Sequence, residues 1–183
     1  MDTRFAAVIL AGGKSSRMGQ DKAQMLRPDG LTQLEHTQAQ VALLNPSFIM
    51  VSGSPDLPDV YPELGPLSGI HAAIEKLNAG DSLLVVPCDL PLLTSDALAP
   101  LLSSTESTAY KDSFLPCLLQ VTESLKQHLN SILENNKFIK KSNFSIKKLL
   151  NFCNVKWTEN NHKKSTESAN TIEIWNKLTA NIK

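Results

Sequence analysis

Short runs of apolar residues without polar alternation mark the first half of the chain. They cover residues 5–9, 47–51 and 83–86, and each leads into glycine, proline or small polar residues. Strands of this kind are buried on both faces, as in parallel sheets covered by helices. Segments with helical apolar spacing separate them at residues 32–44, 66–77 and 95–102, the last with Thr94 as its N-cap. The pattern predicts an α/β fold with a mostly parallel sheet.

The second half is less regular. We expect a strand at 113–120, helices at 123–134, 145–151 and 171–178, and a short strand at 153–157. All eight glycines lie at or before Gly80, so helices beyond it must end on other residues, and Asn135-Asn136 suits that role. Nearer the N-terminus, residues 23–27 suggest a short extended piece that ends at the Pro28-Asp29-Gly30 turn.

Length and composition favour one globular domain. The chain has 183 residues, 42% of them hydrophobic, and no apolar stretch approaches the roughly 20 residues of a membrane span. The apolar start runs into glycines and cations where a signal peptide would have its cleavage site, which favours a cytoplasmic protein without membrane attachment. Cys88, Cys117 and Cys153 lack metal-type spacing and are expected to be reduced, buried thiols.

The formal net charge is zero but unevenly distributed. Residues 1–122 carry 7 Lys+Arg against 13 Asp+Glu, and residues 123–183 carry 11 against 5. A basic half can meet an anionic partner, but it can equally consist of solvated helix faces. The cations are not interleaved with stacking aromatics, so a nucleic-acid partner is not expected.

The stretch from Leu10 to Lys22 carries the clearest chemistry. A buried strand opens into two glycines and small hydroxyl residues, followed by Arg17 and Lys22. Glycines allow close backbone approach to a ligand, and exposed amides with nearby cations are suited to phosphates. The spacing matches neither the Walker loop nor the dinucleotide-binding glycine pattern. A glycine-rich turn with solvated cations is the alternative.

The full pattern Leu-Ala-Gly-Gly-x3-Arg-Met-Gly-x-Asp-Lys resembles the signature of nucleotidyltransferases, in particular the molybdenum cofactor guanylyltransferase (MobA) family. That resemblance implies a single-domain, three-layer α/β/α Rossmann-like nucleotidyltransferase fold. Its nucleotide-binding half would be residues 1–105 and its substrate-binding half residues 106–183. It is specific over residues 5–93 and faint beyond.

Asp89 follows the third apolar run in Pro-Cys-Asp-Leu-Pro. A lone carboxylate opposite a phosphate loop is useful chiefly as a ligand for Mg²⁺, which takes one or two carboxylates together with substrate phosphates. A turn-forming Asp is the alternative. The resemblance also assigns Mg²⁺ and nucleotide binding to Asp89.

The resemblance further implies a base and ribose side. Gly65-Pro66-Leu67-Ser68-Gly69 resembles the family's Gly-Pro-Leu-Ala-Gly element, although it could simply be a stiff helix entry. Asp59 falls where the family has a nucleotide-binding Asp, with Asp56 as competitor, and Ser52 stands where Asn is frequent. Together with the phosphate loop, the expected nucleotide contacts are Leu10, Ala11, Gly12, Gly13, Lys22, Ser52, Asp59, Gly65 and Asp89, with Arg17, Lys22 and Asp89 catalytic.

The C-terminal half resembles the family's sequence motifs only weakly. Phe114-Leu115-Pro116 fits its Pro-containing strand, and residues 168–173 look like a partial Asn-x-Asn-Thr-Pro-Glu motif that lacks the first Asn and the Pro. In the family this half receives the pterin. Lysines that could meet its phosphate, or could equally be solvated, are Lys140, Lys141, Lys147 and Lys148.

The resemblance implies GMP transfer from GTP to the molybdopterin cofactor with Mg²⁺, giving the guanine dinucleotide and pyrophosphate. Molybdoenzymes or other cofactor-biosynthesis proteins are expected as further partners. Two alternatives stay open: a cytidylyl- or sugar-phosphate nucleotidyltransferase, and a non-catalytic protein that binds GTP or the cofactor during molybdoenzyme maturation.

Overall fold

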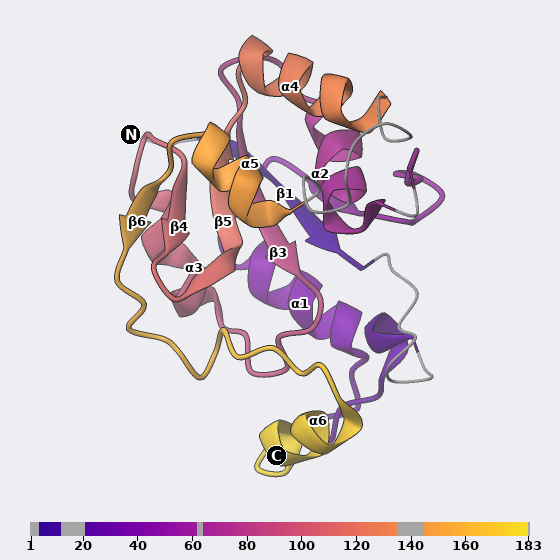
Figure 1. The fold of residues 1–183 in the computed structure, drawn as a ribbon. Coiled ribbons are helices and arrows are strands. Elements are labelled where there is room, and N and C mark those ends of the chain that lie inside the picture. Colours follow the sequence, from indigo (N-terminus) through magenta and orange to yellow (C-terminus); the bar gives the residue numbers. More distant parts are fainter. Residues whose placement is uncertain (1–3, 12–20, 62–63, 135–144, 183) are drawn as a thin grey trace.

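A single six-stranded sheet forms the centre of the protein (Figure 1). The structure, a computed structural model, describes residues 4–11, 21–61, 64–134 and 145–182. The strand order is β2-β1-β3-β5-β4-β6, and only β5 runs antiparallel to its neighbours. The strands are β1 (Phe5–Leu10), β2 (Ile49–Val51), β3 (Ser82–Pro87), β4 (Thr108–Tyr110), β5 (Ser113–Gln120) and β6 (Lys156–Thr158).

Helices cover both faces of the sheet, which confirms the predicted α/β fold of mostly parallel strands. The helices are η1 (Lys22–Gln24, 3-10), α1 (Gln33–Ala42), α2 (Pro66–Ile74), α3 (Ser95–Leu102), α4 (Glu123–Glu134), α5 (Ile146–Phe152) and α6 (Ile172–Thr179). Residues of α2, α4 and α5 share one apolar core with Val8 and Val85, while residues of α1 and α3 share another with Ala7 and Val86. Successive residues of a strand point to opposite faces of the sheet, so neighbours such as Ala7 and Val8 belong to different cores.

The C-terminal helix α6 packs away from the two main cores. Trp175 of α6 forms a small separate cluster with Met25 and Ala169. Met25 directly follows η1, so this contact fixes the end of the chain beside the segment that begins with Lys22. The long connection from β6 to α6 runs along the edge of the sheet in Figure 1.

The three apolar runs of the first half form β1, β2 and β3, as predicted, and β4 is a strand that the sequence pattern did not reveal. Its three residues are too short for a periodic signal. The tight turn at Lys111-Asp112 then reverses the chain, so β5 pairs antiparallel with β4 at Tyr110↔Ser113 and with β3 at Val85↔Cys117. A wholly parallel sheet is therefore excluded.

Several element boundaries differ from the sequence predictions. Helix α2 ends at Ile74, three residues before Leu77, and β6 begins at Lys156. The expected extended piece at 23–27 is partly wrong, because η1 covers Lys22–Gln24 and only Leu26 makes an isolated bridge, to Thr32. Asn135-Asn136 lies outside the described residues.

Thr94 occupies the N-cap of α3, as predicted, but its side chain makes no capping hydrogen bond. The described helices include none that is long and apolar enough to span a bilayer. Cys88 and Cys117 are free and buried, as expected, and Cys153 is half-buried. Burial raises the pKa of Cys88 to about 12 and that of Cys153 to about 11, so neither thiol is reactive near neutral pH.

Candidate active site

The carboxyl ends of β1, β2 and β3 meet at one edge of the sheet. The Cys88 amide donates to the Leu10 carbonyl at 3.2 Å, and the Ser52 amide donates to the Ile9 carbonyl at 3.0 Å. The loops that follow the three strands therefore begin side by side. In open α/β sheets this edge is where ligands bind.

Part of the predicted phosphate loop can be placed. Leu10 ends β1, and the Ala11 amide donates back to the Ile9 carbonyl at 3.1 Å, so this amide is used within the turn. Gly12, Gly13 and Arg17 lie outside the described residues. The chain resumes at Asp21, whose carboxylate accepts from the Ala23 amide and caps η1, the helix that carries Lys22.

Lys22 and Asp89 form the centre of the site. Nζ of Lys22 lies 3.2 Å from Oδ2 of Asp89, and their side chains are 22% and 24% exposed. Asp89 follows β3, so the edge of the sheet brings together a cation and a carboxylate from two separate strand ends. The predicted proximity of Asp89 to the segment after β1 is confirmed.

The connection before α6 completes this cluster. Ser168 Oγ donates to Asp89 Oδ2 at 2.7 Å, and Asn170 Oδ1 accepts from Lys22 Nζ at 3.0 Å. The Ala169 amide also donates to the Asp89 carbonyl at 2.8 Å. Ser168 and Asn170 were not among the predicted site residues, although the partial motif at 168–173 was the signal that could have indicated them.

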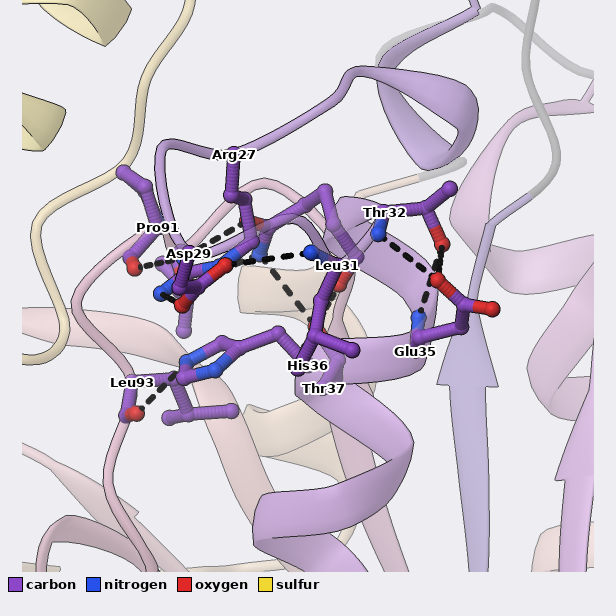
Figure 2. A network of polar contacts seen from close by, with 11 residues as sticks. Arg27, Asp29, Leu31, Thr32, Glu35, His36, Thr37, Pro91 and Leu93 are labelled. Atoms are coloured by element: carbon purple, nitrogen blue, oxygen red, sulfur yellow. Dashed lines mark hydrogen bonds and ion pairs between the residues drawn. The ribbon is translucent and has the colours of Figure 1, made fainter. Parts of the chain in front are cut away.

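A buried polar network holds the Asp89 loop against the Lys22 segment (Figure 2). The buried guanidinium of Arg27 donates to the Pro91 carbonyl and, at 3.3 Å, to Oε1 of Gln33. Gln33 Nε2 in turn donates to the Leu90 carbonyl at 3.0 Å. Two consecutive carbonyls after Asp89 are thus bound by side chains from the segment after Lys22.

The same network is balanced in charge. Arg27 Nη2 lies 2.9 Å from Asp29 Oδ2, and this hydrogen bond lowers the pKa of Asp29. His36 Nε2 lies 3.0 Å from the Leu93 carbonyl, and burial lowers the His36 pKa. A neutral His36 that donates from Nε2 therefore extends the attachment of the loop to a third carbonyl.

The opposite side of the edge is built by the start of α2. Gly65 is the N-cap of α2 with φ 64° and ψ −146°, a backbone conformation that favours glycine, and Pro66 follows in the first turn. Gly69 packs so closely that an added Cβ would lie 2.6 Å from Ser52 Cβ and 3.0 Å from Leu10 Cδ2. Three predicted site positions, Leu10, Ser52 and Gly65, therefore gather around the first turns of α2.

Asp59 lies in the loop between β2 and α2. Its Oδ1 is buried and has no hydrogen-bond partner among the described residues, and desolvation raises its pKa. Asp56, the competing acid, is exposed. An unsatisfied buried acceptor is costly unless a ligand supplies the donor, which favours Asp59 over Asp56 as a ligand contact.

The donor set suits a cation shared with a substrate. The described residues contain no cluster of three or more His, Cys, Asp or Glu side chains that could hold a metal alone. Asp89 is a single, partly exposed carboxylate with a lysine beside it. Such a site fits Mg²⁺, which is commonly held by one or two carboxylates and the phosphates of a nucleotide.

Comparison with known proteins agrees with this geometry. The sequence model of the MobA-like NTP transferase domain matches residues 7–117. A molybdenum cofactor guanylyltransferase from Xanthomonas euvesicatoria is 38% identical over 135 residues, which cover 70% of this chain and 71% of that protein. A probable molybdenum cofactor guanylyltransferase from Clostridium perfringens is 29% identical over 189 residues, covering 94% of this chain and 95% of its own.

Solved structures show the same fold at low sequence identity. Molybdopterin-guanine dinucleotide biosynthesis protein A from Archaeoglobus fulgidus superposes with a TM-score of 0.65 at 18% identity, covering 96% of this chain and 97% of that one. A 4-diphosphocytidyl-2C-methyl-D-erythritol synthase from Anaerococcus prevotii gives a TM-score of 0.69 at 14% identity, covering 98% and 96%. With the match over residues 7–117 and the 38% identical relative, the chain belongs to the MobA-like NTP transferase family.

Proposed function

We propose that this protein is a molybdenum cofactor guanylyltransferase, which transfers GMP from GTP to the molybdopterin cofactor and releases pyrophosphate. The observation that carries the proposal is the cluster of Lys22, Asp89, Ser168 and Asn170 at the strand-end edge. The names of the relatives in Xanthomonas and Clostridium support the choice of guanylyl transfer.

The chemistry is an in-line displacement. A phosphate oxygen of the molybdopterin side chain attacks the α-phosphorus of GTP and forms a new P–O bond. The bond from that phosphorus to the bridging oxygen of the β-phosphate breaks, and pyrophosphate leaves. No covalent enzyme intermediate is needed, so the task of the protein is to position the substrates and to stabilise charge.

Lys22 would change partners when the triphosphate binds. Its ammonium group is already held at the edge by Asp89 and Asn170, and it can turn to a phosphate oxygen without crossing the site. Arg17, Gly12 and Gly13 are proposed as the further phosphate contacts, with Leu10 and Ala11 forming the base of the loop. These groups would offset the negative charge that develops on the leaving pyrophosphate.

Asp89 is the residue that would hold Mg²⁺. An ion held there would offset phosphate charge and supply Lewis-acid chemistry for the transfer. Ser168 donates to Asp89 Oδ2 and so fixes the direction of the carboxylate. On the nucleotide side, Asp59 would accept from guanine N1–H and N2–H, with Gly65 and Ser52 lining the base and ribose.

Two other functions remain as alternatives. A cytidylyl- or sugar-phosphate nucleotidyltransferase would use the same cluster, and solved cytidylyltransferase-type structures share this fold. A maturation partner that binds GTP or the cofactor without catalysis would keep the cluster but release no pyrophosphate. Delivery of product to molybdoenzymes is proposed on the family's role alone.

A nucleotide-panel assay tests the proposal. Purified protein with Mg²⁺ should release pyrophosphate from GTP only when molybdopterin cofactor is present, and GTP but not CTP should raise its melting temperature. Asp89→Ala and Lys22→Ala should each lower the rate by on the order of 10²-fold or more. Release from CTP instead, or full activity in both variants, would exclude the proposed reaction.

A further inference from the structure

The end of the chain, residues 168–182, is held by a small apolar cluster of its own. We refer to this segment as the C-terminal arm. Its tryptophan, Trp175 of α6, is only 5% exposed, yet it belongs to neither of the two main cores. Trp175 instead shares a cluster with Met25, which is 8% exposed, and with Ala169, which is fully buried. Figure 1 shows α6 set apart from the helices that cover the sheet, so this cluster is the apolar attachment of the arm.

The polar attachments of the arm all lie in the candidate active site. Among the described residues, the hydrogen bonds that join the arm to the rest of the chain go to Lys22 and Asp89. Ser168 Oγ donates to Asp89 Oδ2 at 2.7 Å, and Lys22 Nζ donates to Asn170 Oδ1 at 3.0 Å. The Ala169 amide donates to the Asp89 carbonyl at 2.8 Å. The contacts that hold the arm in place are therefore the contacts that build the site.

Ala169 joins the apolar cluster to these polar contacts. Its side chain lies in the cluster with Trp175, while its two sequence neighbours make the side-chain hydrogen bonds of the site. Thr171 follows directly and caps α6, because its Oγ1 accepts from the Ile174 amide at 3.3 Å. Helix α6 thus begins two residues after Ala169, and a displacement of the helix would move residues 168–170 with it.

Met25 joins the same cluster to Lys22. The Met25 amide donates to the Lys22 carbonyl at 3.3 Å and closes the short helix η1. Trp175 therefore packs in one cluster with the residue that ends η1 and with the residue that bonds the Asp89 carbonyl. A single apolar cluster supports both charged groups of the site from behind.

We propose that Trp175 is a positioning residue of the active site, an inference that rests on the proposed function. The burial of its ring holds Ser168 and Asn170 in place, and these two side chains fix the directions of the carboxylate proposed to hold Mg²⁺ and of the ammonium group proposed to meet the triphosphate. Both charged side chains are about a quarter exposed, so they have other conformations to adopt once this support is lost. Trp175 acts through Ser168 and Asn170 and is not a catalytic residue.

Hydrogen exchange of the Ala169 amide tests the docking of the arm without any substrate. This amide is bonded to the Asp89 carbonyl, so its exchange, followed by NMR on the full chain, reports whether the arm is in place. Exchange should become faster by on the order of tenfold in Trp175→Ala, and Trp175→Phe should restore most of the protection. If Trp175→Ala shows no cooperative urea transition, Trp175→Leu is measured in its place.

Nucleotide binding tests the path through which the ring acts. By calorimetry, Trp175→Ala should weaken the binding of GTP with Mg²⁺ by on the order of tenfold, and Trp175→Phe should recover most of it. The double variant Ser168→Ala/Asn170→Ala should lose a similar factor. Adding Trp175→Ala to that double variant should weaken binding by less than about twofold more, because the ring acts through the two side chains already removed.

Two control variants separate positioning from a general loss of stability. Asn176→Ala changes an exposed residue of the same helix and should alter neither the exchange nor the nucleotide affinity. Leu125→Ala removes a side chain that is 1% exposed in a main core. Leu125 lies shortly after the end of β5 that pairs with Ser82 at the start of β3, whereas Asp89 follows the end of β3. Leu125→Ala should lower the urea midpoint and leave the affinity for GTP with Mg²⁺ unchanged.

The outcomes distinguish this inference from the proposed function. Wild-type exchange of the Ala169 amide in folded Trp175→Ala would overturn the positioning role, even if the enzyme transfers GMP normally. An equal loss of nucleotide affinity in Leu125→Ala, or a full tenfold further loss when Trp175→Ala is added to the double variant, would overturn it as well. Faster exchange and weaker nucleotide binding that Trp175→Phe restores, in a protein that releases no pyrophosphate from GTP, would support the positioning role and exclude the transferase reaction.

Discussion

Lys22 Nζ donates to Asp89 Oδ2 at 3.2 Å, although 67 residues separate the two along the chain. With about a quarter of each side chain exposed, an ion pair of this kind contributes only about 0–1 kcal/mol to stability. Because the pair adds little to the stability of the fold, we interpret it, in line with the proposed function, as two charges held ready for a nucleotide and its cation.

This interpretation predicts that substitutions of Lys22 and Asp89 lower the activity strongly and change the stability of the fold little. Lys22→Met and Asp89→Asn should each lower kcat/KM by on the order of 10²-fold while the urea midpoint of unfolding barely moves. The double variant should lose much less than the product of the two effects, because both residues serve one transition state. Lys111→Met, which removes an exposed pair with Glu159, is the control and should retain full activity.

Arg27 should act on the site without touching it. Arg27→Met leaves the Pro91 carbonyl and the Asp29 carboxylate without a buried donor, at a cost of about 1–3 kcal/mol in the free energy of unfolding. Because the loop after Asp89 is then held less firmly, kcat/KM should fall as well. Arg27→Lys should recover the charge but not all the hydrogen bonds, so an intermediate stability is expected.

Denaturant unfolding and steady-state kinetics on the same preparations measure both effects. Arg4→Met serves as control, since Arg4 is exposed at the opposite end of β1. If Arg27→Met matched the Arg4 variant in both measurements, the network of Figure 2 would have no role in holding the loop.

Gly69 should not tolerate a methyl group. An alanine Cβ would lie 2.6 Å from Ser52 Cβ and 2.9 Å from Ser52 Oγ, so α2 and the end of β2 would have to separate. Overpacking of this kind costs about 1–3 kcal/mol, measured by urea unfolding. Gly69→Ala combined with Ser52→Gly should regain part of the loss, and an absence of any rescue would place the strain elsewhere.

Much of this site follows from local sequence, and the rest depends on contacts between distant segments. Asp89 and Lys22 stand next to strong strand and glycine signals, so their placement at the sheet edge could be predicted. Ser168 meets Asp89 across 79 residues. The partial motif at 168–173 could have indicated Ser168 as a site residue, but a local pattern does not show that it contacts Asp89.

The buried Arg27 and the strand β4 escaped prediction for different reasons. A charged residue beside Pro28-Asp29-Gly30 looks like a solvated turn, and only the tertiary fold supplies the Pro91 carbonyl that permits its burial. Strand β4 has three residues and gains its place by pairing with β5 and β6. The antiparallel direction of β5 follows from that unpredicted hairpin.

The ionised carboxylate of Asp59 is expected to lower the stability of the folded protein while it serves ligand binding. Desolvation raises its pKa in the folded protein above the ordinary value of 3.8, so the folded state binds the proton more tightly than the unfolded state does. The stability that Asp59 contributes is fully present below pH 3.8 and is lost as the pH rises through the folded-state pKa. At neutral pH the ionised carboxylate with its buried, unpartnered Oδ1 is destabilising.

Asp59→Asn should therefore raise the melting temperature at pH 7 and have less effect near pH 3.5, while weakening GTP binding because the acceptor for guanine is changed. Thermal scans at the two pH values and GTP titrations at pH 7 measure these effects. Asp56→Asn, at an exposed position of the same loop, should alter neither. A lower melting temperature for Asp59→Asn at pH 7 would contradict the role assigned to desolvation.

Two N-cap threonines offer a test of the local architecture. Thr32 caps α1 with a full capping box: its Oγ1 accepts from the Glu35 amide at 3.2 Å, and Glu35 Oε2 accepts from the Thr32 amide at 2.7 Å. Thr94 holds the same position on α3 but makes no side-chain capping bond. Thr32→Ala should lower the free energy of unfolding by about 1 kcal/mol, and Thr94→Ala by much less. Hydrogen bonds from Thr32 also lower the pKa of Glu35. The stability that the capping box contributes should therefore be present at neutral pH and lost as the pH falls through that lowered pKa.

Urea unfolding of Thr32→Ala and Thr94→Ala at pH 7 and at pH 3.5 measures both effects. Equal losses in the two variants at pH 7 would show that the cap hydrogen bond at α1 adds nothing to stability.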